Sequence, residues 1–148
     1  MRRYGEPPDP TQRYRNRPGA YAIILGPQGV LLTVESRPGY AVDVALPGGG
    51  IDPGESTQPA LHREVMEETG WRIAVDRRFT TYQRFCFMPE YDLWARKICH
   101  IYACRSVRAH SAPLDPHHTA IWADPDYAAA MISNPADGHV LDAYLRLI

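Results

Sequence analysis

The stretch GGGIDPGESTQPALHREVMEETGW, from Gly48 to Trp71, begins with a glycine run and continues into good helix formers. Ser56 is a favourable N-cap, and Pro59 falls in the first turn, where a missing backbone N–H costs nothing. Gly70 supplies the C-terminal stop, because glycine readily adopts the left-handed conformation that ends many helices. We therefore predict one helix over residues 56–69, directly after a glycine-rich loop.

Three glutamates of this helix, Glu64, Glu67 and Glu68, fall within an arc of about 100° on its surface. Leu61 and Val65 lie at the edge of that arc and should anchor the helix on the core. In a partly buried setting, each like-charge pair about 6 Å apart would cost about 3 kcal/mol unless a cation or a proton compensates. Grouped carboxylate oxygens suit hard ions such as Mg²⁺ and Mn²⁺. Taken alone, the helix fits either a metal site or an ordinary solvated acidic face.

The spacing around the helix favours the metal site. It resembles the Nudix box, G-x5-E-x7-R-E-U-x-E-E-x-G-U with U apolar, and agrees with that pattern at every specified position. The specified positions are held by Gly49, Glu55, Arg63, Glu64, Val65, Glu67, Glu68, Gly70 and Trp71. The resemblance extends, more weakly, from about Pro18 to the end of the chain.

The resemblance to the Nudix family implies an α/β (α+β) fold, an αβα sandwich around a mixed β-sheet. Members of the family hydrolyse a nucleoside diphosphate linked to another group. They use divalent cations, usually Mg²⁺, for which Mn²⁺ can substitute. The resemblance therefore implies an Mg²⁺-dependent pyrophosphohydrolase with a small nucleotide as its substrate.

By matching position, the resemblance also implies catalytic and metal-binding roles for Gly48, Glu64, Glu67 and Glu68. Glu67 and Glu68 would be metal ligands, and Glu64 a further ligand or the base that activates water. The carbonyl of Gly48 would bind metal as well, which suits a backbone without an obstructing Cβ. Glu55 and Arg63 would pair across the loop and the helix in a supporting role.

One position departs from the family pattern. Many relatives carry another glutamate a few residues before a tryptophan, and Thr119 holds that place here. A threonine hydroxyl cannot act as a base at pH 7. We therefore expect Glu64 to be the base, and the candidates outside the box are Asp115, Glu90 and Asp92.

Aromatic residues gather after the box, and four of them are candidates for stacking on a nucleobase: Tyr82, Phe85, Tyr91 and Trp94. Ordinary core and strand packing is the alternative for each. The pair His117-His118 invites a metal interpretation, but adjacent residues point in different directions, so we expect a surface loop there.

Three interpretations of the substrate follow from the sequence. Small size favours a nucleotide-clearing enzyme that acts on nucleoside triphosphates. An ADP-ribose or nucleotide-sugar pyrophosphatase is the alternative, although Pro89 comes slightly later than that branch expects. An alternative of another class is a Nudix-fold module that binds a nucleotide without cleaving it. The complete set of box carboxylates favours the enzyme.

Composition narrows the remaining classes of function. The chain has 148 residues and a formal net charge of −1, so no broad field directs it to nucleic acid or to a membrane surface. The three cysteines lack a C-x-x-C arrangement and suit a reducing compartment. No signal-like or membrane-spanning apolar run is present, so we expect a cytoplasmic protein. The sequence leaves the oligomeric state open, a homodimer included.

The rest of the chain predicts one domain over residues 18–148, after an extended arm over residues 1–17. The arm is rich in proline and arginine, and a solvated tail and a phosphate-contacting arm are its two interpretations. A β-hairpin is predicted from Ala20–Gly26 and Val30–Glu35, further strands after the box, and two helices near the C-terminus.

Overall fold

The structure is a computed structural model that describes all 148 residues. Eight strands form one mixed sheet, and three α-helices and a short 3-10 turn complete the chain. The elements are β1 (Arg2–Tyr4), β2 (Arg15–Gly26), β3 (Gly29–Glu35), β4 (Asp43–Ala45), β5 (Gly48–Gly50), α1 (Thr57–Thr69), β6 (Trp71–Met88), η1 (Pro89–Tyr91), β7 (Leu93–Ala109), β8 (His118–Ala123), α2 (Pro125–Met131) and α3 (Pro135–Leu147).

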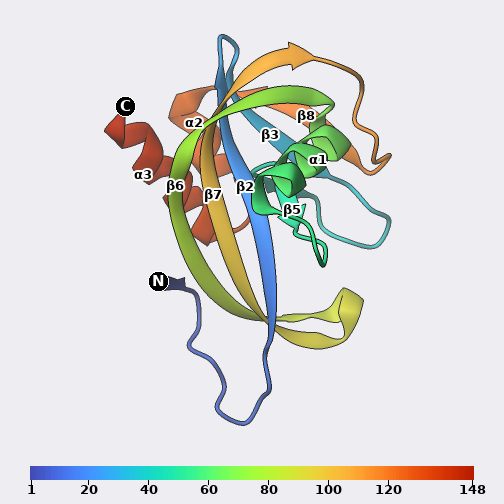
Figure 1. Ribbon diagram of the computed structural model, residues 1–148, viewed down its shortest axis with the longest axis vertical. Helices are drawn as coiled ribbons and strands as arrows, with labels where there is room; N and C mark the ends of the chain where they lie inside the picture. Colours follow the sequence, from blue (N-terminus) through green and yellow to red (C-terminus); the bar gives the residue numbers. More distant parts are fainter.

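The sheet has the strand order β1-β6-β7-β2-β3-β4, with β5 paired to β2 and β8 paired to β3. The pairs β1·β6 and β2·β7 are parallel, and the others are antiparallel. Helix α1 packs on one face, and α2 and α3 pack on the other (Figure 1). This arrangement confirms the predicted αβα sandwich around a mixed sheet.

Two hydrophobic clusters hold these layers together, one on each face of the sheet. On the α1 side, Leu61 and Val65 are fully buried against side chains of β2 and β3, including Ile24. On the other side, Val140 and Leu141 of α3 pack against β2, β3 and β7. The predicted anchoring of the acidic helix by Leu61 and Val65 is therefore confirmed: these side chains lie at one edge of the acidic arc and are buried on the sheet.

The sheet opens beside β2, and this opening positions the site. Strand β2 pairs with β3 over Ile24–Gly26, but with β5 over Gly19–Tyr21. Its other edge pairs with β7 along eleven successive positions, from Arg15 to Leu25. β3 and β5 separate along one edge of β2, and residues of both strands line a hollow there together with Glu68 of α1.

Two segments differ from the sequence-based expectation. Residues Arg2–Tyr4 of the expected arm form β1 on the outer edge of β6, and β2 already begins at Arg15. The separate strands expected directly after the box form one long strand, Trp71–Met88, which has three register irregularities along β7. A long antiparallel partner can hold both halves together because β-bulges absorb the extra residues. None of the helices is long and apolar enough to cross a membrane.

Candidate active site

The C-terminal end of α1 is fixed by Gly70, which adopts the left-handed conformation with φ 73°. Its N–H donates to the carbonyl of Met66, and a Cβ at this position would lie 1.9 Å from the carbonyl oxygen of Ser111. No other residue fits there without displacing the backbone of the following loop. The predicted helix stop is therefore confirmed. At the other end Ser56 is the N-cap residue, although its side chain makes no capping hydrogen bond.

Glu68 is the most enclosed carboxylate of the site. The backbone N–H of Gly48 donates to Glu68 Oε1 at 2.9 Å, and the Glu68 side chain is 13% exposed. Burial raises the pKa of Glu68 to about 8, while the Gly48 N–H opposes this shift; the nearby Glu64, Glu35 and Asp115 raise the pKa further. A buried carboxyl among other acids holds its proton unless a cation compensates the charge.

Glu64 lies directly against the glycine strand. A Cβ added to Gly49 would come within 2.6 Å of the Glu64 carboxylate, so glycine is required for this close approach. Burial is the largest cause that raises the pKa of Glu64, and Arg63 counteracts it. A carboxyl with a raised pKa beside a glycine backbone suits a group that takes up a proton during a reaction.

Arg63 connects the loop to the helix. Its Nε donates to Glu55 Oε2 at 2.8 Å and its Nη2 to Glu55 Oε1 at 2.9 Å, a two-pronged pairing. This pairing lowers the pKa of Glu55 to about 2, chiefly through the hydrogen bonds from Arg63. Arg63 Nη1 also donates to Glu64 Oε1 at 3.0 Å and to Glu67 Oε1 at 3.3 Å.

These additional contacts of Arg63 were not expected from the sequence. Arg63 lies between Glu64 and Glu67. No three His, Cys, Asp or Glu side chains of the structure form a metal-ligand set in this arrangement. Of the predicted ligands, Glu64 and Glu67 contact the guanidinium of Arg63 and would have to leave it to bind an ion. The metal roles of Gly48, Glu64, Glu67 and Glu68 remain predictions.

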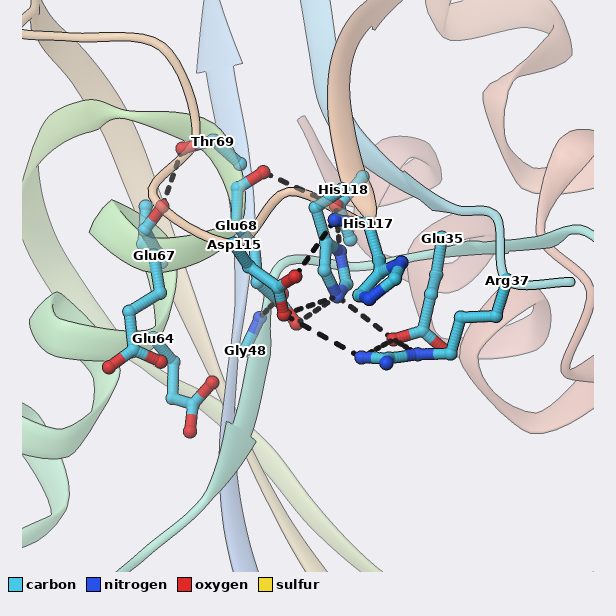
Figure 2. A network of polar contacts seen from close by, with 12 residues as sticks. Glu35, Arg37, Gly48, Glu64, Glu67, Glu68, Thr69, Asp115, His117 and His118 are labelled. Atoms are coloured by element: carbon cyan, nitrogen blue, oxygen red, sulfur yellow. Dashed lines mark hydrogen bonds and ion pairs between the residues drawn. The ribbon is translucent and has the colours of Figure 1, made fainter.

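His118 is the residue that the sequence-based interpretation missed. It begins strand β8, and its side chain is 7% exposed. His118 Nε2 lies 3.0 Å from Glu35 Oε2 and 3.6 Å from an oxygen of both Glu68 and Asp115 (Figure 2). Its Nδ1 lies 2.8 Å from Thr33 Oγ1, which fixes the orientation of the ring. The expectation of a surface loop is wrong for His118, because the pairing of β8 with β3 turns this side chain toward the hollow.

A signal for His118 was nevertheless present in the sequence. His118, Ala120 and Trp122 alternate with Thr119 and Ile121, the period-2 pattern of a strand with one face turned inward. The segment begins with polar residues, which favoured its interpretation as a loop. Thr119, at the position expected for a glutamate, is exposed.

The carboxylates considered outside the box lie in two different places. Asp115 belongs to the site: its Oδ2 lies 3.6 Å from His118 Nε2, and its backbone N–H donates to the carbonyl of Glu67 at 2.9 Å. Glu90 and Asp92 lie in the turn between β6 and β7, with Asp92 in the left-handed conformation that closes the 3-10 turn.

Two concave spaces meet at this site. The acidic hollow, of about 180 Å³, is lined by Tyr21, Thr33, Glu35, Asp43, Ala45, Leu46, Gly48, Gly49, Glu68, Lys97 and His118. The adjoining cavity, of about 420 Å³, is lined by Tyr21, Asp43, Ala45, Tyr82, Arg84, Lys97, Cys99, Ser133, Asn134, Pro135 and Asp137. The two spaces adjoin, because four residues line both of them: Tyr21, Asp43, Ala45 and Lys97.

The four candidate base-stacking aromatics are not in one place. Tyr82 is 1% exposed, and its hydroxyl donates to Asp137 in the cavity wall. A ring buried to this degree has no free face for a base, so the stacking prediction does not hold for Tyr82. Phe85 and Trp94 pack edge-to-face around Tyr14, and Tyr91, 57% exposed, lies at the β6–β7 turn.

The sequence and the structure are similar to those of known proteins. The NUDIX domain family profile matches residues 15–144. The CTP pyrophosphohydrolase of Escherichia coli is 28% identical over 85% of this chain and 90% of its own length. The 8-oxo-(d)GTP phosphatase of Mycolicibacterium smegmatis is 30% identical over 81% of this chain, which spans only 35% of that protein. A NUDIX hydrolase structure from Nitrosomonas europaea superposes with a TM-score of 0.71 over 88% of each chain, at 24% identity.

Proposed function

The chain belongs to the Nudix family and is a Nudix-type pyrophosphohydrolase, and from this we propose that it splits nucleoside triphosphates into a nucleoside monophosphate and pyrophosphate with the help of Mg²⁺. The observation that carries the proposal is the junction of the acidic hollow with the larger cavity through Lys97. Two of the similar proteins carry names that refer to nucleoside triphosphates, CTP and 8-oxo-(d)GTP. A ligand with a polyphosphate end and a nucleoside end matches two joined spaces of unequal size.

The residues of the hollow fit a divalent ion. Glu68 is buried, and its pKa is raised to about 8. The largest cause of this rise is burial, which disfavours the charged form of the carboxyl. A cation beside Glu68 and Glu64 would stabilise the charged form of both carboxyls. Carboxylate and backbone oxygens are the ligands that Mg²⁺ prefers. When bound, Mg²⁺ neutralises phosphate charge and makes a water more acidic. We propose that Gly48, Glu64, Glu67 and Glu68 hold it.

The other steps of the reaction are assigned to side chains of the protein. Glu64 takes a proton from the attacking water, for which its raised pKa and its place against Gly49 suit it. The oxygen of that water ends on one phosphorus of the anhydride, and the bridging oxygen leaves with the electron pair. The Arg63–Glu55 pair keeps the loop and the helix in one geometry while this happens.

The cavity is rich in hydrogen-bond donors, which supports its role for the nucleoside end. Arg84 Nε is buried without a hydrogen-bond partner. Asn134 uses its Oδ1 to accept from Ala136, which leaves its amide N–H groups free. Ser133 Oγ accepts from the N–H of Val44, so its O–H remains free to donate. A base that presents acceptors, or a ribose hydroxyl, satisfies these groups.

A substrate panel tests the proposal. It holds ordinary and oxidised nucleoside triphosphates, ADP-ribose, nucleotide sugars and dinucleoside polyphosphates, each with and without Mg²⁺. We expect the highest kcat/KM for a nucleoside triphosphate and no turnover in excess chelator. Faster cleavage of ADP-ribose or of a nucleotide sugar would move the enzyme to the alternative branch, and turnover without a divalent ion would contradict the metal assignment.

A further inference from the structure

Strand β1 lies on the outer edge of β6, beside the wall of the cavity (Figure 1). In the parallel register, Arg2 is opposite Tyr82 and Tyr4 is opposite Arg84. Tyr82 and Arg84 are the two residues of β6 that line the cavity, whereas no residue of β1 lines it. The short strand β1 is therefore placed to support the cavity wall from outside.

Tyr4 joins β6 to helix α3 at this wall. Its ring packs edge-to-face on Tyr82, with 5.1 Å between the ring centres and 78° between the ring planes. It is also stacked on His139 of α3, with 6.2 Å between the centres and 20° between the planes. The guanidinium of Arg2 lies 4.5 Å from the centre of the Tyr4 ring. Aromatic pairs with these spacings attract each other, so Tyr4 holds Tyr82 and α3 in one relative position.

The two partners of Tyr4 continue into the cavity wall. The hydroxyl of Tyr82 donates to Asp137 Oδ1, and Asp137 lies two residues before His139 on α3. Tyr82 and Asp137 are both buried, and both line the cavity. A hydrogen bond weakens steeply when its distance or angle changes. The bond between Tyr82 and Asp137 therefore depends on the spacing of β6 and α3, which Tyr4 helps to set.

Arg84, the other residue of β6 in the wall, is flanked by the chain directly after β1. A Cβ on Gly5 would lie 3.7 Å from Arg84 Cγ and 3.9 Å from Arg84 Cδ, so the backbone of Gly5 passes close to the Arg84 stem. Arg84 Nε is buried and has no hydrogen-bond partner. A donor of this kind can serve a ligand only while its stem stays in place. Residues 4 and 5 thus contact both side chains through which β6 forms the wall.

From these contacts we propose that Tyr4 is a positioning residue for the nucleoside end of the substrate, because it holds Tyr82 and α3 in the arrangement that shapes the cavity. The proposal rests on the proposed function, since it takes the cavity as the nucleoside site. No residue of β1 lines the acidic hollow, and α1 packs on the opposite face of the sheet from α3. Tyr4 should therefore affect substrate binding and the choice between nucleobases, and leave the chemical step unchanged.

A second aromatic pair distinguishes this role from general stabilisation of the fold. Phe79 of β6 packs edge-to-face on Tyr144 of α3, with 5.0 Å between the ring centres. This pair joins the same two elements, but neither ring lines the cavity or the acidic hollow. Phe79→Ala is therefore the matched control, because it removes the same kind of contact away from the wall.

The test measures kcat and KM for the best triphosphate of the substrate panel and for three triphosphates with other bases, with saturating Mg²⁺. Tyr4→Ala should raise KM for the best substrate about tenfold, keep kcat within about twofold and narrow the range of kcat/KM among the bases. Tyr4→Phe keeps the ring and should behave like the wild type. If Tyr4→Ala does not fold, Tyr4→Leu replaces it, because leucine fills space without an aromatic contact.

Phe79→Ala should lower the urea midpoint of unfolding, as Tyr4→Ala does, but keep the KM of the wild type. Circular dichroism shows that each variant is folded at the assay temperature. An unchanged KM in Tyr4→Ala, a loss confined to kcat, or an equal rise of KM in Tyr4→Ala and Phe79→Ala overturns the proposal while the proposed function stands.

A binding measurement separates this proposal from the proposed function. Calorimetric titration with the monophosphates of the nucleosides in the panel needs no turnover. We expect Tyr4→Ala to bind the tightest monophosphate about tenfold more weakly than the wild type, and Phe79→Ala to bind it equally well. If the panel shows no hydrolysis but this difference is found, the proposed function fails alone. Absent binding by the wild type, or equal affinities of the wild type and Tyr4→Ala, overturns the proposal.

Discussion

The backbone N–H of Gly48 donates a 2.9 Å hydrogen bond to Glu68 Oε1, which joins strand β5 to the last turn of helix α1. One carboxylate oxygen is thereby held by the backbone, and the other lies 3.6 Å from His118 Nε2. The position of Glu68 depends on the close approach of a glycine strand as much as on its place in the helix. A change to glutamine keeps a side-chain oxygen that can accept this hydrogen bond.

Glu67→Gln and Glu68→Gln should each lower kcat by at least about 100-fold, because the amide keeps the shape but loses the charge that neutralises a cation. In Glu68→Gln, the side-chain oxygen can still accept from Gly48, so the fold should be retained. The measurement is steady-state hydrolysis with saturating Mg²⁺, together with circular dichroism. Wild-type rates from well-folded variants would refute the ligand assignment.

Glu55→Gln should raise the Mg²⁺ concentration needed for half-maximal rate and weaken activity. The change removes the negative charge that Arg63 contacts through two hydrogen bonds of 2.8 and 2.9 Å. The loop should then be held less firmly, and Arg63 should pair only with Glu64 and Glu67. Titration of the rate with Mg²⁺ measures the effect. The control is Asp76→Asn, which breaks the exposed pair with Arg105 away from the site. An unchanged Mg²⁺ dependence in Glu55→Gln would contradict the supporting role assigned to the Glu55–Arg63 pair.

Glu64→Gln should show a larger fall in kcat than Asp115→Asn, Glu90→Gln or Asp92→Asn. Glu64 lies against Gly49 and has a pKa raised by burial, whereas Glu90 and Asp92 lie in the β6–β7 turn. Asp115 should rank second, since it lies 3.6 Å from His118. The four variants are compared as profiles of kcat against pH with a mononucleotide substrate. If a carboxylate outside the helix shows the greatest fall, the base lies there.

His118→Ala should destabilise the metal-free protein by about 1–3 kcal/mol, the usual consequence of unpairing buried polar groups. The change removes the ring that lies between Glu35, Glu68 and Asp115 and leaves those carboxylates facing one another. Mg²⁺ should restore most of the loss, because a cation separates the same charges. Urea unfolding in chelator and in Mg²⁺ measures both values. The same loss in the two conditions would mean that His118 acts only through packing.

The stability of the metal-free protein should fall as pH rises from about 5 to about 8. Glu68 ionises near its ordinary value of 4.5 in the unfolded chain but near 8 in the folded one, so the folded state binds more protons in this window. The stability contributed by this bound proton is present near pH 5 and is lost as the pH rises toward the folded-state pKa of Glu68, about 8. Glu68→Gln should flatten the dependence of the urea midpoint on pH. An equally steep dependence in that variant would show that other groups cause it.

Short-range patterns in the sequence were sufficient for the chemical core of the site. The helix between Ser56 and Gly70, its anchoring through Leu61 and Val65, and its acidic arc all follow from caps and from the 3.6-residue period. These features depend on neighbours within a few residues, which is why the sequence alone determined them. The box spacing then indicated the family, which the match over residues 15–144 confirms.

Contacts between distant segments required the tertiary structure. The approach of His118 to Glu68 depends on the register of β8 on β3, and the hydroxyl of Tyr82 donates to Asp137 of α3, 55 residues later. A hollow lined by Arg13 and Trp94, among others, likewise joins the segment before β2 to the β6–β7 turn. Register and layer packing are set by the burial of whole faces, a sum over many weak contacts that no single stretch encodes. For this reason the sequence by itself determined which carboxylates lie on one helix, and only the fold decided which side chains surround them.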